Sequence, residues 1–306
     1  MRPIFAAVLM LAGCEGRAPA PPREFDGALA LRYVEAQLAF GPRIPGGEGH
    51  RRMAAWLDSL LRTRADSVEV QRWTHVTREG VSLPLVNYLA RFNPAAPARL
   101  LFLAHWDTRP KADAAASRDS TLPVPGANDG ASGVAVLLAM ADALKKAPPG
   151  VGVDLLFVDG EDYGSFDQGK DQDVLLGSRY YAAHLPAGPP PRFAVLFDMV
   201  GDKDLRIQRE GSSVTGAPDV VEAVWDLADR LGYAKVFVDE DGFAITDDHT
   251  PLQEAGIRAI DLIDFDYGPG NKWHHSPDDT ADKVSAASLQ IVGDVGMGLV
   301  RVAKPA

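Results

Sequence analysis

The sequence predicts an α/β fold of three layers, in which helices cover both faces of a central, mostly parallel mixed sheet. Three short apolar runs, at residues 100–104, 153–158 and 193–197, are typical of strands buried on both faces. Segments with apolar residues at helical spacing lie between and after these runs. Strands that alternate with helices along a chain usually form a parallel sheet, because each crossover returns the chain to the same end of the sheet.

The other expected elements follow from the N-terminus. Two segments with helical spacing come first and are separated by a loop rich in glycine and proline, and two probable strands follow them. Three longer helices are expected between or after the apolar runs. In chain order, these helices and strands are expected at residues 28–39, 49–62, 67–73, 85–92, 132–146, 218–231 and 285–302.

Composition limits the classes of protein to which the chain can belong. Its 306 residues are 46% hydrophobic and 24% charged, which suits one large globular domain, expected over residues 25–306. The formal net charge of −11 argues against nucleic acid as a partner, because binding the phosphate backbone calls for clustered lysine and arginine. With a single cysteine, the chain cannot form an intramolecular disulfide.

The N-terminal segment resembles a bacterial lipoprotein signal. A positive charge at Arg2 precedes an apolar stretch over residues 3–10, which is too short to span a bilayer. The box Leu-Ala-Gly-Cys then ends at the lone cysteine, Cys14. We therefore expect a signal peptide over residues 1–13 and a tether over residues 14–24 that is rich in proline and alanine.

This interpretation predicts an exported lipoprotein that faces the periplasm or the cell exterior. It would contact a membrane only through a lipid on Cys14. The alternatives are an ordinary secretory signal and an N-terminus that is apolar by accident.

Polar residues that could carry chemistry stand where the apolar runs end. In open α/β sheets, ligands bind beyond the carboxyl ends of the strands, so we expect these side chains to converge. Taken alone, an acidic residue there is more often a helix cap or a solvated loop charge, and that is the plainer interpretation of Asp129. The candidates are His105, Asp129, Glu161, Asp162, Asp198 and the pair His274-His275.

These residue types favour a catalytic zinc ion. Carboxylates and imidazoles are the ligands that zinc takes when thiolates are absent, whereas calcium and magnesium prefer oxygen ligands alone. The adjacent Glu161 and Asp162 cannot both be ionised at low cost unless a cation neutralises one of them. We therefore expect Asp162 to bind the metal and Glu161 to carry protons. The alternative for this pair is an acidic turn that caps a helix.

The chain resembles the zinc aminopeptidase superfamily and, within it, the bacterial glutaminyl cyclases. The resemblance runs from about residue 85 to the C-terminus. An Asn-Asp-Gly-Ala-Ser-Gly block is typical of the superfamily, and His-Trp-Asp-Thr-Arg-Pro, Glu-Asp-Tyr-Gly and Thr-Asp-Asp-His blocks favour the cyclases. The matching blocks lie at residues 104–110, 126–134, 159–164, 176–179, 197–201 and 245–249.

This resemblance implies an aminopeptidase-like fold and one zinc ion bound by Asp129, Asp162 and His275. It implies that Glu161 shuttles protons and that Asp198 and Asp247 belong to a supporting hydrogen-bond network. The expected reaction converts the N-terminal Gln of a peptide or protein to pyroglutamate and releases ammonia. The alternative is a two-zinc aminopeptidase, in which His105 and Asp198 would bind a second metal that shares Asp129.

Two departures from the animal cyclases and one ambiguity stand out. Asp162 replaces a glutamate, and Asp261 replaces a histidine of the network. Either member of the pair His274-His275 could bind zinc, and the spacing to the downstream Asp-Asp favours His275. Trp106, Trp273 and His105 are further expected to line the substrate pocket, although a tryptophan beside an active site is about as often a packing residue.

Overall fold

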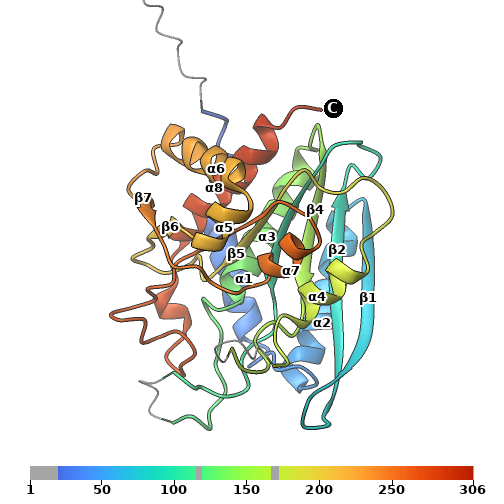
Figure 1. Cartoon of the computed structure of the whole chain (residues 1–306), viewed down its shortest axis with the longest axis vertical. Helices are drawn as coiled ribbons and strands as arrows, with labels where there is room; N and C mark the ends of the chain where they lie inside the picture. Colours follow the sequence, from blue (N-terminus) through green and yellow to red (C-terminus); the bar gives the residue numbers. More distant parts are fainter. Residues whose placement is uncertain (1–19, 115–118, 167–171, 306) are drawn as a thin grey trace, which may run out of the picture.

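The computed structural model describes residues 20–114, 119–166 and 172–305, which form a sheet with helices on both faces (Figure 1). The predicted signal peptide, Cys14 and most of the tether lie outside the described residues. Among the residues that are described, no helix is long and apolar enough to cross a membrane.

The main sheet has six strands. The first two form an antiparallel hairpin, β2 runs antiparallel to β4, and the remaining neighbours are parallel. This confirms the predicted mixed, mostly parallel sheet. In spatial order the strands are β1 (Ser67–Val76), β2 (Ser82–Phe92), β4 (Gly152–Val158), β3 (Arg99–His105), β5 (Ala194–Asp198) and β8 (Ala259–Ile263).

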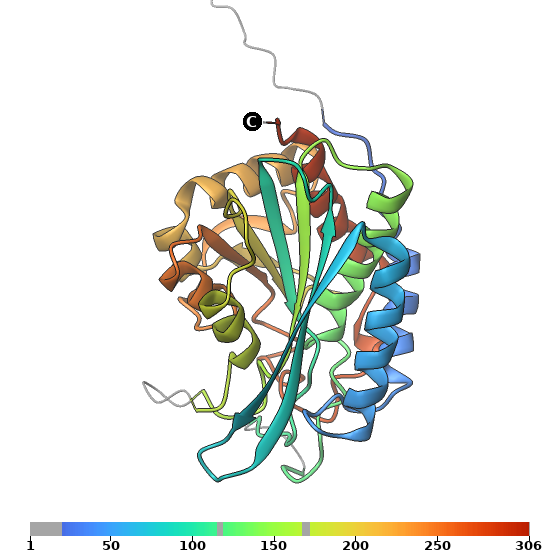
Figure 2. The ribbon, with the colours of Figure 1, turned by 90° about the vertical axis from the view of Figure 1, so that its right-hand side faces the viewer.

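Helices cover both faces of this sheet, and side chains that alternate along each strand point into two separate cores. On β3, Phe102 belongs to the larger core, whereas Leu101 and Leu103 belong to the smaller one. Figure 2 shows the blue α1 and α2 and the green α3 on one side of the sheet, and the yellow-green α4 on the other. The first layer is α1 (Gly27–Leu38), α2 (Glu48–Arg64), α3 (Ala131–Lys146) and α8 (Ala286–Val302), and the second includes α4 (Leu176–Ala183), α5 (Gly211–Gly216) and α7 (His249–Glu254).

Each predicted helix and strand is present, with its ends shifted by a few residues. The short elements escape the sequence patterns, because helices of six to eight residues show too little periodicity and β8 carries Asp261 in its middle. A second small sheet of β6 (Ile207–Arg209) and β7 (Phe237–Asp241) was also not predicted. It lies next to α6 (Pro218–Arg230), which packs against α8.

The parallel strands determine where the polar residues meet. Because β3, β4, β5 and β8 run in the same direction, their carboxyl ends share one edge of the sheet. The loops after β3 and β4 gather at the lower end of the molecule in Figure 1. The sheet therefore brings together residues that are far apart in the sequence.

Candidate active site and metal centre

Asp129 stands in a tight turn just before α3. The backbone N–H groups of Asn128 and Asp129 donate to the two carboxylate oxygens of Asp279, at 2.8 and 3.2 Å. Gly130 follows with φ of +83°, and a Cβ there would lie 2.8 Å from the His105 backbone oxygen. A side chain would therefore both strain this turn and collide with the end of β3.

Glu161 and Asp162 lie in the turn after β4. Their backbone N–H groups donate to the Asp107 carboxylate, at 3.0 Å for Glu161 and 3.1 Å for Asp162. Both acidic side chains are buried. Burial, together with the nearby Asp129 carboxylate, raises the pKa of Asp162 to about 7. A bound cation would stabilise the ionised form that burial disfavours.

His275 faces both of these turns. Its Nε2 atom lies 3.6 Å from Asp129 Oδ2 and 3.4 Å from Asp162 Oδ1. Within the described part of the chain, no hydrogen-bond donor reaches the buried Asp129 Oδ2 or Asp162 Oδ2. These two buried oxygens receive no hydrogen bond and lie beside an imidazole nitrogen. Together the three atoms form a set of ligands that suits zinc.

The neighbouring His274 is placed less favourably. Its Nε2 atom lies 3.9 Å from Asp129 Oδ2, its Nδ1 atom is 3.1 Å from the Asn271 side-chain amide, and its ring meets Phe265 edge-on. Asp129, His274 and His275 could together hold an ion. Of the two histidines, His275 is the one that lies near both Asp129 and Asp162.

A second group of possible ligands lies on the other side of Asp129. His105 Nε2 is 3.1 Å from Asp129 Oδ1 and 3.2 Å from Asp198 Oδ1. All three side chains are buried, and their ligand atoms lie within 4.8 Å of one another. The two groups share Asp129, so the geometry is compatible with one metal position or with two.

Glu161 lies beside His105, with its Oε2 atom 3.7 Å from His105 Nδ1. Burial raises the pKa of Glu161 well above its ordinary value, and the nearby Asp162 and Asp247 carboxylates raise it further. Burial and the nearby Asp198 carboxylate likewise raise the pKa of Asp247. Such carboxyl groups keep a proton to higher pH than exposed ones do.

Asp261 also faces this acidic group from the middle of β8. Neither of its carboxylate oxygens receives a hydrogen bond from a described residue. Burial and the neighbouring Asp247 carboxylate raise the pKa of Asp261 well above its ordinary value.

Trp106, which is expected to line the substrate pocket, packs inside the protein in the free chain. Trp106 is completely buried, its ring stacks on His50 with 4.4 Å between centroids, and its Nε1–H donates to the Val86 carbonyl. It is a packing residue beneath the loop that starts at His105. His105 is equally buried, and its ring faces the acidic side chains of Asp129, Glu161 and Asp198.

Trp273 is partly buried and lies closer to open space. It packs against an apolar cluster of Met199, Ile263 and Tyr267. The Lys272 and Lys283 ammonium groups lie 5.4 and 5.2 Å from the centre of its ring.

Two of the hollows among the described residues lie beside the site. One, of about 440 Å³, is lined by residues that include Arg109, Asp113, Phe166 and both members of the histidine pair. The other, of about 560 Å³, includes Ile245, Ile263 and Phe265 among its lining residues. A substrate can therefore approach the site from the side of His275.

Sequence reasoning missed four residues that hold this site in place, namely Asp107, Arg109, Asp113 and Asp279. Asp107 and Arg109 stand in the block that follows β3, and Asp279 follows the histidine pair, so their positions carried a signal. Their role was not predictable, because it consists of contacts with loops far away in the sequence.

Comparisons with known proteins point to one family. Residues 87–300 match the sequence profile of peptidase family M28. The aminopeptidase YwaD of Bacillus subtilis is 26% identical over 244 residues, which cover 78% of this chain. The chain spans about half of that aminopeptidase, with 47% of its length covered.

Two solved structures from Bacteroides thetaiotaomicron match nearly the whole chain. A glutaminyl cyclase bound to N-acetylhistamine superposes with a TM-score of 0.88 at 35% identity, covering 93% of this chain and 100% of that one. A leucine aminopeptidase precursor superposes with a TM-score of 0.87, also at 35% identity and with the same coverage.

Proposed function

The chain belongs to peptidase family M28, and from this premise we propose that it is a zinc-dependent glutaminyl-peptide cyclotransferase. It would convert the N-terminal Gln of peptides or proteins to pyroglutamate and release ammonia. The observation that carries the proposal is the buried Glu161 carboxyl group, which lies next to Asp162 and 3.7 Å from His105. Support also comes from the 35% identity to a glutaminyl cyclase of known structure over 93% of this chain.

Asp129, Asp162 and His275 would hold the zinc ion. The two buried carboxylate oxygens without donors and the His275 Nε2 atom support this set. When bound, zinc polarises the side-chain carbonyl of the substrate and stabilises the negative charge that develops on its oxygen. The fixed turns around Asp129 and Glu161 position these ligands before any substrate arrives.

Glu161 would move the proton. The substrate's α-amine attacks its own side-chain carbonyl carbon, a nitrogen–carbon bond forms, and the bond to the amide nitrogen breaks. Glu161 accepts a proton from the attacking amine and donates it to the departing nitrogen, which leaves as ammonia. No water is consumed. The raised pKa of Glu161, which results mainly from burial, supports this double role.

Asp198 and Asp247 would support Glu161 through the acidic network, together with Asp261. Burial and the Asp198 carboxylate raise the pKa of Asp247, and burial and the Asp247 and Asp198 carboxylates raise the pKa of Asp261. Carboxyl groups with a raised pKa keep a proton to higher pH, so such a network can exchange protons with Glu161. Trp273 would form an apolar wall for the substrate's glutamine side chain, supported by its partly exposed position beside Ile263 and Tyr267.

A two-zinc aminopeptidase is the second candidate. The cluster of His105, Asp129 and Asp198 favours it, because these residues could hold a second ion that shares Asp129. In that enzyme, Glu161 would take a proton from a water molecule that attacks the peptide bond. The similarity to a leucine aminopeptidase precursor is as extensive as the similarity to the cyclase.

One pair of assays separates the two functions. We expect the zinc-loaded protein to release ammonia from a Gln-peptide and to leave a product with a blocked N-terminus. A matched peptide with an acetylated α-amine cannot cyclise and serves as the control. Metal analysis should find about one zinc per chain, as one catalytic site requires. Release of free amino acids, with two metals per chain, would select the aminopeptidase.

We also propose that the protein is exported and anchored by a lipid on Cys14. The Leu-Ala-Gly-Cys box after the apolar stretch at residues 3–10 supports this. Labelling cells with a radioactive fatty acid should mark the full chain but not its Cys14→Ser variant. Equal labelling of both proteins would contradict the anchor.

A further inference from the structure

An ion pair next to the site connects two of the proposed zinc ligands. The Arg109 guanidinium donates to both oxygens of Asp113, through Nε at 2.8 Å and Nη2 at 2.7 Å. Its remaining nitrogen, Nη1, donates to the Asp162 carboxylate. Arg109 is buried whereas the Asp113 side chain is half exposed, and the two parallel hydrogen bonds fix the relative orientation of the two groups.

Asp113 in turn contacts His275. Its Oδ1 atom lies 3.3 Å from His275 Nδ1, the ring nitrogen opposite the one that faces Asp129 and Asp162. The backbone N–H of the next residue, Ala114, donates to the His275 carbonyl at 3.2 Å. His275 has a φ of +51°, a backbone conformation that non-glycine residues rarely adopt. The loop after β3 therefore contacts both its ring and its strained backbone.

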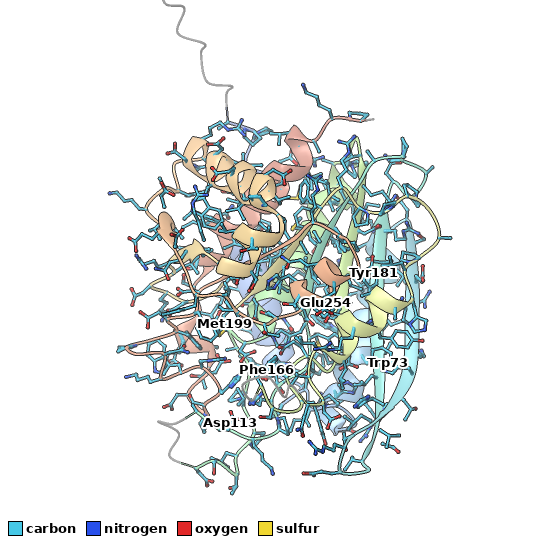
Figure 3. The ribbon with its side chains drawn as sticks, viewed as in Figure 1. Trp73, Asp113, Phe166, Tyr181, Met199 and Glu254 are labelled. Carbon is cyan, nitrogen blue, oxygen red and sulfur yellow. The ribbon has the colours of Figure 1, made fainter. Side chains whose placement is uncertain are left out.

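These contacts form a chain from Asp162 through Arg109 and Asp113 to His275. Its members come from three loops, after β3, β4 and β8. Asp113 lies near the lower end of the molecule in Figure 3, beyond Met199, in the region where these loops gather. The chain of contacts links one proposed ligand to another, from Asp162 Oδ1 at one end to His275 Nδ1 at the other.

We propose that Asp113 is the positioning residue for the zinc-binding His275, and that Arg109 holds Asp113 in place. This inference rests on the proposed zinc site. Asp113 accepts the Nδ1–H of His275, which leaves the Nε2 lone pair directed at Asp129 and Asp162. A carboxylate on the far side of a ligand histidine sets its tautomer and ring orientation and makes it a better donor.

The simpler alternative is that Arg109 and Asp113 form an ordinary ion pair four residues apart. The chain offers a matched control, because Asp58 and Arg62 in α2 form an ion pair with the same spacing, at 2.9 Å and away from the site. Asp58→Ala removes the same charge and breaks an equivalent contact. If zinc affinity falls in Asp113→Ala but not in Asp58→Ala, the loss comes from the positioning of His275 and not from breaking an ordinary ion pair.

The test measures zinc affinity of the purified full chain by competition with a chromophoric chelator. We expect Asp113→Ala to bind zinc about 10- to 100-fold more weakly, the effect typical of removing such a partner. Asp113→Asn keeps an oxygen that can accept the Nδ1–H and should recover part of this loss. Thermal unfolding of the zinc-free Asp113→Ala protein should match the wild type, and Asp58→Ala should keep wild-type affinity.

Three outcomes would overturn the inference. These are wild-type zinc affinity in Asp113→Ala, an equal loss in Asp58→Ala, or a loss accompanied by reduced stability of the zinc-free protein. In each case the proposed function stands if the wild-type chain binds zinc and cyclises Gln-peptides. A wild-type chain that binds no zinc would overturn the zinc site itself, and the inference with it.

Discussion

The Asp107 carboxylate accepts the backbone N–H of Glu161 at 3.0 Å, and its second oxygen accepts the next N–H along the chain at 3.1 Å. Asp107 is completely buried and stands two residues after the end of β3. This contact ties the loop after β3 to the turn after β4. The backbone of Glu161, the proposed proton carrier, is therefore held in place by Asp107, which takes no part in the proposed chemistry.

Asp107→Asn tests this support. Its amide group can accept one of the two N–H groups but meets the other with an N–H of its own. Leaving a buried donor unsatisfied should lower the free energy of unfolding by about 1–3 kcal/mol, and turnover should fall because Glu161 is displaced. Urea denaturation and kcat measure the two effects. As a control, Asp119→Asn changes an exposed acceptor of the Thr121 N–H and should shift stability by less than about 0.5 kcal/mol.

Glu161→Gln should abolish most turnover without releasing zinc. The variant keeps the size and burial of the side chain but cannot exchange a proton, a role that usually contributes about 100- to 10,000-fold to the rate. Steady-state kinetics with a Gln-peptide and metal analysis of the same sample check both parts. If Glu161→Gln kept the kcat of the wild type, Glu161 would have no part in the mechanism under either enzymatic function.

The two histidines should differ in their contribution to zinc binding. His275 Nε2 lies within 3.6 Å of both Asp129 and Asp162, whereas His274 approaches only Asp129, at 3.9 Å. We expect His275→Ala to weaken zinc binding by more than about 100-fold, since loss of a ligand's partner alone costs about 10- to 100-fold. His274→Ala should have a smaller effect in the same competition assay. The reverse order would make His274 the ligand.

Substitution of the two tryptophans should affect different properties, namely stability for Trp106 and substrate binding for Trp273. Trp106 is fully buried, so Trp106→Ala should cost about 3–5 kcal/mol of stability. Trp273 is partly exposed, and Trp273→Ala should mainly raise KM for a Gln-peptide. Denaturation curves and KM values for both variants test this. An unchanged KM in Trp273→Ala would remove it from the substrate pocket.

Loss of the proton on Asp264 should lower the free energy of unfolding as pH rises. Burial raises the pKa of Asp264 from an ordinary 3.8 to about 6, so the folded state holds this proton more tightly than the unfolded state does. Stability from this group is therefore present below about pH 4 and is lost by about pH 6. At about 1.4 kcal/mol per pKa unit, the loss is at most about 3 kcal/mol.

Asp264→Asn cannot titrate and should lack this loss. The difference in unfolding free energy between variant and wild type should shift in favour of the variant between pH 4 and pH 7. Urea denaturation of the zinc-free proteins measures it. Asp241→Asn, which removes an exposed carboxylate at the end of β7, is the control. Parallel pH profiles for Asp264→Asn and the wild type would contradict the burial effect.

Local patterns were sufficient to predict the architecture. Continuous apolar runs such as residues 153–158 fit only the interior of a sheet covered on both faces, and the structure places β4 there. The same runs located Glu161 and Asp162 at a strand end, because ligands bind where parallel strands finish. Short elements such as α5 and α7 were missed because so few residues show no period.

The amino-acid sequence by itself determined the α/β fold, the inventory of acidic and histidine side chains, and the suitability of that inventory for zinc. Only the tertiary structure decided that Trp106 is a packing residue and that His275 approaches both Asp129 and Asp162. It also revealed the contact of Asp113 with His275, 162 residues further along the chain. The physical reason is that burial and distance depend on which loops meet at the edge of the sheet, whereas periodicity and residue type are properties of each segment alone.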